Sequence, residues 1–422
     1  MSEKFVIHGG KPLKGEIEVR GAKNATFPIL ASTILTRGTC FISNIPLIED
    51  VFRMIEILES MGAKVAWKGK RSLNIQTRSI DPSKIKKDLI LKLRGSVLFF
   101  GPLLARFGKV SLPQPGGCII GARPIWTHLD AFSQLGVKIT PEKNAFFLEL
   151  EKPLKEQVVV LNELSVTATE NILLFCSNFP VKITLKIADC DYQIIELIKF
   201  LKKMGVKIRW ASPHTLVIEG SKKLKEADHR LIYDPIEAGT FIIMAAATKG
   251  DVLVKNAELS FLDLPLKKLK DFGVPFKIID QKTIRILPWK SLKIDKIQSL
   301  PYPGIPSDLQ SVFGVLATQA KGTTIIHDPM YEGRLKYLEE LNKIGAKIFF
   351  ADPHRATIEG PTPLFGDELG PLDLRGGAAL IIAGLIAKGK TTINNIYQVD
   401  RGYEKIEERL QKLGADIKRV NE

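Results

Sequence analysis

The chain alternates between helices that are apolar on most sides and helices that are apolar on one side only. Six segments carry few charges after their first turn, and each ends at a glycine or proline before a strand-like stretch: 24–37, 95–107, 167–179, 237–249, 308–321 and 376–388. A helix that is apolar all round belongs inside a core. Amphipathic helices such as 48–61 and 332–344 are predicted to cover that core. Each unit is therefore expected to run buried helix, strand, exposed helix, strand, strand.

A glycine follows the exposed helix of every unit, and a short strand comes after it. These glycines lie 68 to 74 residues apart, at Gly62, Gly136, Gly205, Gly273, Gly345 and Gly414. Glycine adopts a left-handed conformation at little cost, so it can end a helix at this place. Recurrence at a fixed period indicates one supersecondary unit copied six times. Six such units predict an α/β protein of two domains, each with three repeats around buried helices.

The predicted domain boundaries lie near residues 21 and 231. Residues 22–231 form one domain, and residues 1–21 join residues 232–422 in the other, so that the beginning of the chain adds a strand to the C-terminal domain. A chain of 422 residues is long enough for two or three domains. The loop 111–124 belongs to the first of these domains and is expected to act as its lid.

Composition and charge narrow the functional classes. No apolar run reaches the roughly 18 residues that a bilayer-spanning helix needs, and residues 1–4 do not lead into a signal-like apolar stretch. A cytoplasmic protein without a membrane partner is therefore expected. The net charge of +15 favours anionic partners such as nucleotides, phosphates, nucleic acid or an acidic membrane surface, but a lysine-rich solvated surface is the better explanation.

The cysteines and histidines give no sign of a metal site or of disulfides. Cys40, Cys118, Cys176 and Cys190 contain no C-x-x-C pair, and the six histidines show no ligand spacing. Cys40 and Cys176 lie in apolar segments and are expected to be buried. Cys118 differs, because it follows two glycines and two nearby prolines on a loop between a strand and a helix. Such a thiol can donate a proton, or attack as a thiolate if neighbouring cations lower its pKa.

Polar residues stand at the starts of the buried helices. They are Lys23, Asn24, Arg94, Ser165 and Thr167 in the first half, and Glu237, Asp308, Asp373 and Arg375 in the second. Helix N-termini leave unpaired N–H groups and a partial positive charge, so they attract anions. Ordinary capping is an equally good interpretation for Ser165, Thr167 and Asp308. The basic residues are poor caps and therefore favour an anionic ligand.

Three further arginines occupy equivalent repeat positions after predicted strands: Arg123, Arg334 and Arg401. Arginine binds carboxylate and phosphate groups through two parallel hydrogen bonds. A surface salt bridge would explain any one of them alone. Their recurrence at matching positions favours a common ligand.

Several short motifs are spread over nearly the whole chain. They are Gly21-Ala22-Lys23-Asn24, Gly116-Gly117-Cys118-Ile119-Ile120-Gly121-Ala122-Arg123-Pro124, Ile305-Pro306-Ser307-Asp308, Tyr331-Glu332-Gly333-Arg334, Asp373-Leu374-Arg375 and Asp400-Arg401-Gly402-Tyr403-Glu404. Together they resemble the motifs of the UDP-N-acetylglucosamine enolpyruvyl transferase family. The resemblance implies two inside-out α/β barrels of three repeats each. It also implies transfer of the enolpyruvyl group of phosphoenolpyruvate to the 3′-hydroxyl of UDP-N-acetylglucosamine, the first committed step of peptidoglycan synthesis and hence of cell-wall biogenesis.

The resemblance also implies roles for individual residues. Lys23, Arg123 and Arg401 would hold phosphoenolpyruvate, Asp308 would take the proton of the sugar hydroxyl, and Cys118 would protonate C3. The implied catalytic residues are Cys118, Asp308, Lys23 and Arg401. The implied substrate-binding residues are Lys23, Asn24, Arg94, Arg123, Pro124, Ile125, Trp126, Thr127, Ser165, Val166, Thr167, Asp308, Met330, Arg334, Asp373, Arg375 and Arg401. No metal or cofactor is required, a monomer is expected, and the family's inhibitor fosfomycin should alkylate Cys118.

The sequence departs from the family pattern at three places. Trp126, near the expected uridine, and Glu163 replace the usual acidic and basic residues respectively. The segment Asp189-Cys190-Asp191-Tyr192 replaces an acidic segment that contains proline. The departure at Trp126 puts the family's nucleotide contacts in question. None of the three removes a catalytic group.

Two other functions fit part of the sequence. The shikimate-pathway enolpyruvyl transferase shares the fold and phosphoenolpyruvate but lacks the Gly-Gly-Cys motif. A basic repeat protein that binds nucleic acid and has no enzymatic activity would account for the charge and the sixfold repeat. That second function leaves Cys118 and the cationic helix starts unexplained.

Overall fold

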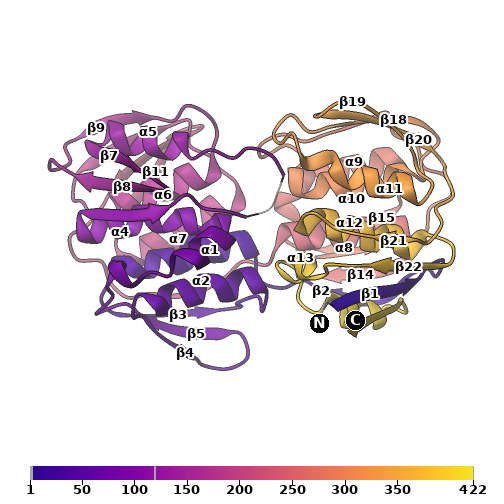
Figure 1. Cartoon of the computed structure of the whole chain (residues 1–422), viewed down its shortest axis with the longest axis horizontal. Helices are drawn as coiled ribbons and strands as arrows, with labels where there is room; N and C mark the ends of the chain where they lie inside the picture. The colour runs from indigo at the N-terminus through magenta and orange to yellow at the C-terminus, as the bar shows by residue number, and fades with distance from the viewer. Residues whose placement is uncertain (1–2, 118–119, 422) are drawn as a thin grey trace. The chain divides into compact units, whose positions relative to one another are not determined.

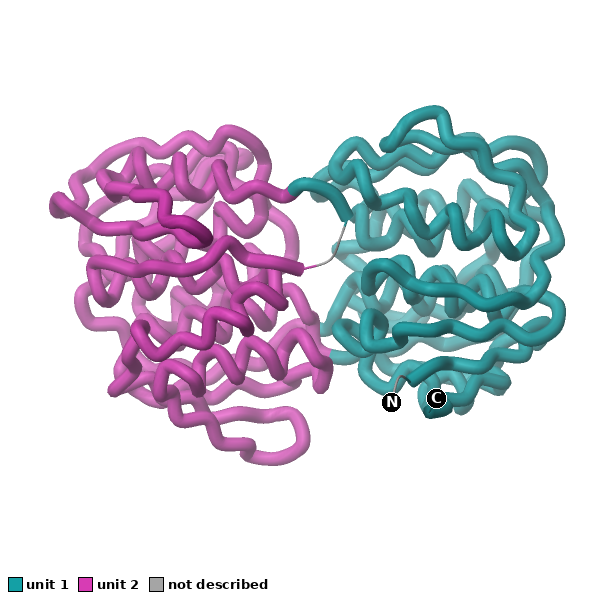
Figure 2. Tube along the Cα trace, in the orientation of Figure 1, with its two compact units in different colours: residues 1–20, 118–122, 233–422 teal, residues 21–117, 123–232 magenta. Residues whose placement is uncertain are grey.

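The computed structural model describes residues 3–117 and 120–421, and the contacts within it divide the chain into two compact units (Figure 1 and Figure 2). Unit 1 consists of the described residues of Met1–Arg20, Cys118–Ala122 and Tyr233–Glu422, and unit 2 of Gly21–Gly117 and Arg123–Ile232. Two of the points at which the chain passes between the units lie between residues 20 and 21 and between residues 232 and 233. Residues 120–122 of the expected lid loop belong to unit 1.

Each repeat contributes one buried helix, and each unit packs three of them together. In unit 2 they are α1 (Lys23–Ser32), α4 (Phe100–Phe107) with the preceding 3-10 helix η3 (Arg94–Phe99), and α6 (Val166–Cys176). In unit 1 they are α8 (Pro235–Ala247), α10 (Ser307–Ala317) and α12 (Leu374–Ile386). Every residue of α8 is buried, and α8, α10 and α12 contact one another. The prediction that the apolar segments form core helices is confirmed.

A second helix in each repeat is amphipathic and turns one side to solvent. These helices are α2 (Glu49–Ser60), α5 (Trp126–Gln134), α7 (Tyr192–Met204), α9 (Asp263–Phe272), α11 (Tyr337–Lys343) and α14 (Ile406–Gln411). The six predicted glycines follow them with φ between +80° and +107°. This left-handed conformation confirms that glycine ends each helix, because a side chain at such a φ is strained. Two shorter helices, α3 (Lys87–Lys92) and α13 (Tyr397–Asp400), lie outside this pattern.

Open β-sheets make up the remaining regular structure of both units. The strands of unit 2 are β3 (Thr39–Ser43), β4 (Lys64–Trp67), β5 (Ser72–Gln76), β6 (Lys109–Pro113), β7 (Val137–Glu142), β8 (Ala145–Leu150), β9 (Gln157–Val160), β10 (Lys182–Lys186), β11 (Lys207–Ser212), β12 (Thr215–Glu219) and β13 (Asp228–Arg230). They form the sheets β13-β3-β5-β4, β6-β8-β7 and β11-β12-β10-β9. In each of these sheets the last strand of a repeat lies between the two strands made before it.

The strands of unit 1 follow the same plan. They are β1 (Glu3–His8), β2 (Lys14–Glu18), β14 (Asp251–Lys255), β15 (Phe276–Asp280), β16 (Thr283–Ile286), β17 (Lys296–Gln298), β18 (Gly322–His327), β19 (Lys347–Asp352), β20 (Arg355–Gly360), β21 (Glu368–Leu369), β22 (Lys390–Ile393) and β23 (Asp416–Asn421). Their sheets are β15-β16-β14-β2, β17-β18-β20-β19 and β21-β22-β1-β23. None of the sheets formed by the described strands closes into a barrel.

The first 20 residues complete two sheets of unit 1. β1 lies between β22 and β23 and runs antiparallel to both, so that Phe5 faces Ile393 on one side and Arg419 on the other. β2 pairs in parallel with β14. In the other repeats the strand at the place of β1 belongs to the repeat itself. The sixth repeat therefore begins near the end of the chain and is completed by residues 3–8.

The helices that the structure describes are short or polar compared with those that cross a membrane. In the part of the chain that the structure describes, no helix combines the length and the apolar character needed to cross a bilayer.

Candidate functional site

In unit 1, the starts of two buried helices hold an ionic cluster around Asp308. Arg334 donates from Nη2 to Asp308 Oδ1 at 2.8 Å, and Arg375 Nη2 lies 3.1 Å from Asp308 Oδ2. The side chains of both arginines are 4% exposed, whereas that of Asp308 is 27% exposed. A ligand can therefore reach Asp308 more easily than the arginines that hold it.

Arg334 is held by several groups of unit 1 and so has a fixed orientation. Its Nη1 donates to Asp373 Oδ1 at 3.3 Å, and its Nε donates to Ser307 Oγ at 2.9 Å. Ser307 in turn donates to Asp328 Oδ2 at 2.6 Å. Burial alone would lower the pKa of Arg334, but the nearby carboxylates raise it overall, so the guanidinium stays charged.

Arg375 connects Asp308 to the core of the unit. Its Nη1 donates to the hydroxyl of Tyr403 at 3.0 Å, and that hydroxyl shares a hydrogen bond of 2.9 Å with Thr240 of α8. Burial alone would lower the pKa of Arg375, but the charges of Tyr403 and Asp308 are among those that raise it well above its ordinary value. Arg375 is therefore a permanent cation beside one oxygen of Asp308.

The structure distinguishes the capping residues from their neighbours at the helix starts. Ser165 Oγ accepts the N–H of Ala168 at 3.4 Å and caps α6, and Asp373 accepts two N–H groups and caps α12. Thr167 and Asp308 are each the second residue of their helices, two residues beyond the N-cap position. Of the three residues for which capping was considered, only Ser165 occupies an N-cap.

In unit 2, Lys23 opens α1 and is paired with a carboxylate. Its Nζ lies 2.8 Å from Asp50 Oδ2 on α2, and both residues are buried. The same Nζ lies 5.6 Å from the centre of the Phe27 ring. Asp50 was not expected beside Lys23, because it stands on a helix that was predicted only to cover the core. An anion at Lys23 would share this cation with Asp50.

Arg94 and Arg123 lie against the glycine that precedes Cys118. A Cβ built on Gly117 would be 2.9 Å from Arg94 Cβ and 3.0 Å from Arg123 Nη2, and Gly117 has φ +124°. Arg94 also donates to the carbonyl of Pro124 at 3.1 Å. Two cations therefore flank the backbone just before the expected catalytic thiol. Cys118 itself lies outside the described residues.

His128 on α5 is a buried neighbour of these groups that the sequence did not single out. Asn171 Oδ1 accepts the N–H of Gly101 at 2.9 Å, which leaves its Nδ2 to donate to His128 Nδ1 at 2.9 Å. The proton of the imidazole is then on Nε2, which lies 3.1 Å from Thr167 Oγ1. Burial and the charge of Arg94 lower the pKa of His128 to about 3, so the ring is neutral at pH 7.

Two of the three departures from the family pattern lie close to one another in unit 2. Trp126 is 65% exposed and packs edge-on against Phe146, with ring centres 6.4 Å apart. Glu163 Oε1 accepts a hydrogen bond from Thr127 Oγ1 at 2.9 Å. Glu163 therefore contacts the segment 123–127 that was predicted to bind the nucleotide.

The remaining predicted residues occupy varied positions. Arg401 stands at the C-cap of α13 and donates to Gln398 Oε1 at 3.1 Å. A turn and this short helix separate it from β22. Met330 is exposed, and its N–H donates to Asp328 Oδ1 at 3.1 Å beside the Asp308 cluster. Asn24 and Val166 are half-buried in the first turns of their helices.

The three cysteines in the described ranges form no disulfide bond. Cys40 and Cys176 are buried, as predicted, and Cys190 is partly exposed; all three are free thiols. Among residues 3–117 and 120–421, no group of three or more His, Cys, Asp or Glu side chains is placed to hold a metal ion.

Comparisons with known proteins place this arrangement in a family. Residues 7–410 match the family model described as EPSP synthase (3-phosphoshikimate 1-carboxyvinyltransferase). The chain is 39% identical to the UDP-N-acetylglucosamine 1-carboxyvinyltransferase of Treponema denticola, with 98% of each chain covered. It is 41% identical to the protein of the same name from Halothermothrix orenii, with 99% of each covered.

Solved structures share the fold at lower identity. The enolpyruvyl transferase NikO from Streptomyces tendae has a TM-score of 0.89 and 24% identity over 99% of both chains. The EPSP synthase of Acinetobacter baumannii has a TM-score of 0.72 and 18% identity over the full length of both. The match of the family model and the identity to full-length relatives agree with the motifs of the sequence. The chain belongs to the EPSP synthase family of enolpyruvyl transferases and, within it, to the UDP-N-acetylglucosamine 1-carboxyvinyltransferases.

Proposed function

We propose that this protein transfers the enolpyruvyl group of phosphoenolpyruvate to the 3′-hydroxyl of UDP-N-acetylglucosamine and releases phosphate. The sugar oxygen forms a bond to C2 of phosphoenolpyruvate while C3 takes up a proton, which gives a tetrahedral phospholactoyl intermediate. C3 then loses a proton, the bond between C2 and the phosphate oxygen breaks, and the enol ether remains. Proton transfer and positioning can carry both steps.

Asp308 takes the proton of the 3′-hydroxyl in this proposal, and its surroundings carry the argument. Its carboxylate is accessible, and two buried arginines fix both oxygens. The same two cations make Asp308 a weak base, because they stabilise its ionised form. Proton transfer is therefore expected to occur as the oxygen attacks C2, when the hydroxyl proton becomes acidic. Arg334 and Arg375 act here as positioning residues.

The substrate anions are assigned to the cations of the predicted site. Phosphoenolpyruvate carries a carboxylate and a phosphate, and we assign these groups to Lys23, Arg123 and Arg401. Cys118 gives its S–H proton to C3. The UDP-sugar is assigned to the set formed by Asn24, Arg94, 123–127, 165–167, Met330 and the Asp308 cluster. Arg94 and Arg123 lie against Gly117, which supports a role for both near the thiol.

A phosphate-release assay tests the substrate. Purified protein is incubated with phosphoenolpyruvate and either UDP-N-acetylglucosamine or shikimate 3-phosphate, and inorganic phosphate is measured over time. Release only with the UDP-sugar is the expected result. Release only with shikimate 3-phosphate would show that the substrate assignment is wrong and that the second enolpyruvyl transfer reaction is correct.

Replacing the thiol tests the proposed proton donor. Cys118→Ala is expected to lower turnover by about 10²- to 10⁴-fold, the usual contribution of a general acid, while UDP-sugar binding persists. The measurements are phosphate release and calorimetric binding of UDP-N-acetylglucosamine. Cys40→Ala, at a buried thiol, is the matched control. Turnover near that of the wild type in Cys118→Ala would remove Cys118 from the mechanism, as would a failure of fosfomycin to alkylate it.

Membership of the family also supports finer expectations. We infer that each unit has the inside-out barrel arrangement, because three buried helices and three open sheets account for each unit. A cytoplasmic monomer that binds small molecules and not nucleic acid fits this function. Light scattering of the purified protein tests the monomer, and a filter-binding assay with duplex DNA at varied salt tests nucleic-acid binding.

A further inference from the structure

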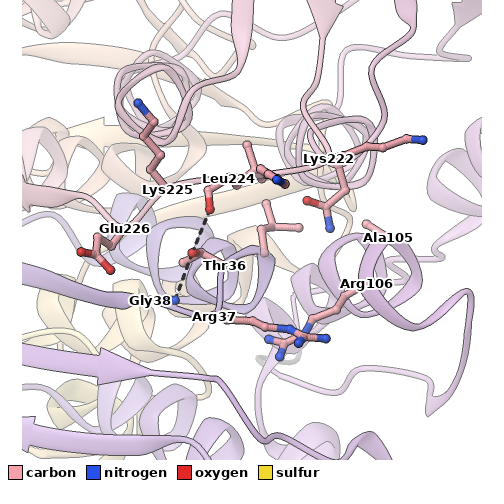
Figure 3. A pocket seen from close by; sticks show the side chains of 12 residues that line it. Thr36, Arg37, Gly38, Ala105, Arg106, Lys222, Leu224, Lys225 and Glu226 are labelled. Carbon is pink, nitrogen blue, oxygen red and sulfur yellow. Dashed lines mark hydrogen bonds between the residues drawn. The ribbon is translucent and has the colours of Figure 1, made fainter.

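A cavity of about 780 Å³ lies in unit 2, away from the residues described above (Figure 3). It is lined by residues 35–38 at the end of the first buried helix, residues 105–106 near the end of α4, Asn178 and the loop 222–226. Ligand cavities in proteins commonly enclose about 300–1,000 Å³. The cavity is therefore large enough for a small organic ligand.

Positive charge dominates the lining of this cavity. Five of the residues that line it are cations and one is a carboxylate: Arg37, Arg106, Lys222, Lys223, Lys225 and Glu226. Among the described residues, none of the five cations forms an ion pair. Surface lysines and arginines elsewhere in the chain often have a carboxylate within 4.0 Å. The cavity therefore concentrates five cations around one carboxylate, Glu226, which in the described part of the chain forms no ion pair with any of them.

Arg106 lines the cavity and is held in place by three acceptors of unit 2. It donates to the carbonyls of Ile34 at 2.8 Å and Arg78 at 2.9 Å, and to Thr77 Oγ1 at 3.2 Å. Burial and then the charge of Arg37 lower its pKa, so the two guanidinium groups are close enough to repel each other. Two arginines that face one cavity without an intervening carboxylate are a suitable arrangement for binding an anion.

The two loops that form the cavity are tied together. Thr36 Oγ1 donates to the carbonyl of Leu224 at 3.1 Å and accepts the N–H of Gly38 at 3.2 Å, as Figure 3 shows. A Cβ at Gly38 would lie 2.2 Å from Glu226 Oε2. Glycine at position 38 therefore lets Glu226 lie close to the backbone at one side of the cavity. These contacts fix the loop that carries the three lysines.

The cavity is separate from the proposed substrate residues of unit 2. Lys23 begins α1, and Leu35 ends the 3-10 turn that follows it, so a rise of about 1.5 Å per residue puts them roughly 18 Å apart. Basic residues at helix ends also offset the negative end of the helix dipole. That explains Arg106, which donates to Ile34. It does not explain Lys222, Lys223 and Lys225, which follow a strand.

We propose that this basic cavity, defined by Arg37, Arg106, Lys222, Lys223 and Lys225, binds a small polyanion that carries two or more phosphate groups. A single phosphate would occupy only part of the volume and contact only some of the cations. Linked phosphates can contact the two arginines and the lysines of the loop at the same time. This binding site is independent of the proposed enolpyruvyl transfer.

Methyl-labelled NMR of the full chain tests the proposal. Inorganic tripolyphosphate is titrated at about 0.15 M ionic strength, and the methyl shifts of Leu35 and Leu224 report the cavity while those of Val166 report the substrate side. Saturable shifts at both leucines are expected. Arg37→Glu/Lys223→Glu should weaken the affinity by about tenfold or more. Its rate of phosphate release from phosphoenolpyruvate should stay the same.

The matched control carries the same change in net charge elsewhere in unit 2. Lys143→Glu/Lys152→Glu alters two exposed lysines away from the cavity and should change the affinity by about threefold or less. An equal loss in both double variants, shifts confined to Val166, or no saturable shift would each overturn the proposal. Arg37→Ala/Lys223→Ala, which removes the charges without reversing them, must also weaken binding for the proposal to stand.

Discussion

The two units differ in the charge of the residue that stands second in a buried helix. The second residue of a buried helix is Asn24 in α1, Thr167 in α6, Asp308 in α10 and Arg375 in α12. In unit 1 an aspartate and an arginine at this position contact each other directly. In unit 2 the corresponding residues are neutral, and the nearby cations come from other positions. Position in the repeat therefore does not determine charge, and in the other two buried segments the second residue is not polar: it is Ile236 in α8 and Gly95 in η3.

This difference gives the two units different roles in the proposed reaction. The cluster in unit 1 contains carboxylates and arginines that hold one another, so Asp308 is oriented before any substrate binds. In unit 2, Lys23 has Asp50 as its partner, and Arg94 lies against the backbone before Cys118. In the proposed reaction, unit 1 supplies the proton acceptor Asp308 together with Arg401, and unit 2 supplies Lys23 and Arg123 for the anionic groups of phosphoenolpyruvate. Four predictions test this division, beginning with the largest expected effect.

The first prediction removes the proton acceptor of unit 1. Asp308→Asn keeps the shape of the side chain but removes its charge, and turnover should fall by about 10²- to 10⁴-fold. Phosphate release measures the change, and circular dichroism checks that the fold persists. Asp308→Glu, which keeps the carboxylate, should retain more activity than Asp308→Asn. If Asp308→Asn were within tenfold of the wild type, the role assigned to unit 1 would be wrong.

The second prediction removes a cation of unit 2. Lys23→Gln should raise the KM for phosphoenolpyruvate by about 10- to 100-fold, because a hydrogen bond to a charged group contributes roughly 1.5–3 kcal/mol. It should also lower stability, because Asp50 is left buried without its partner. The control is Lys23→Gln/Asp50→Asn, which should recover stability but not KM. Recovery of both would mean that Lys23 acts only through the fold.

The third prediction concerns the pH dependence of unit 2. The folded state holds the pKa of His128 at about 3, below its ordinary value of 6.5. The unfolded chain therefore binds more protons between these values, so stability is full above about pH 6.5 and falls as the pH drops toward 3. Urea unfolding at several pH values should show a slope of up to about 1.4 kcal/mol per pH unit from this group.

A substitution isolates that contribution. His128→Gln should flatten the pH dependence of the free energy of unfolding between pH 4 and pH 6, because no group at this position then titrates. His8→Gln, at an exposed strand end in unit 1, is the matched control and should leave the slope unchanged. Equal slopes in the wild type and His128→Gln would contradict the buried neutral imidazole.

The smallest effect concerns the repeat that both units share. Gly205 ends α7 with φ +107°, and a Cβ there would meet no atom within 4 Å. Gly205→Ala should therefore cost about 1–2 kcal/mol from backbone strain alone. Gly370 also has open space but no left-handed φ, so Gly370→Ala should stay within about 0.5 kcal/mol of the wild type. Thermal unfolding of both variants measures the difference, and equal effects would refute the strain argument.

Local chemistry explains why most of the fold was predictable. The six glycines that end helices predict a left-handed backbone conformation, and the six apolar segments predict burial. Neither prediction depends on a residue that is distant in the sequence. Among the candidate site residues, Arg375 could be singled out because arginine is a poor helix cap, and the structure brings it into contact with Asp308. Cys118, the most conspicuous residue of the sequence, lies outside the described residues, so its role stays a prediction.

Partners that are distant in the sequence were not predictable. Asp50 meets Lys23 only because α2 covers the start of α1, and the sequence of α2 resembles any amphipathic helix. His128 carries no metal-ligand spacing, and its link to Thr167 depends on how α5 and α6 pack. The basic cavity brings together residues 35–38 and 222–226, which are almost two hundred positions apart.

The position of β1 has a consequence for synthesis of the chain. Residues 3–8 emerge from the ribosome first, but both of their neighbours in the sheet, β22 and β23, are made last. Every strand and helix of unit 2 is complete before either neighbour exists. The first strand therefore has neither of its two neighbours in the sheet while the intervening unit is translated. A segment that pairs only after such a delay is available to chaperones, or to the edge strands of other chains, throughout that time.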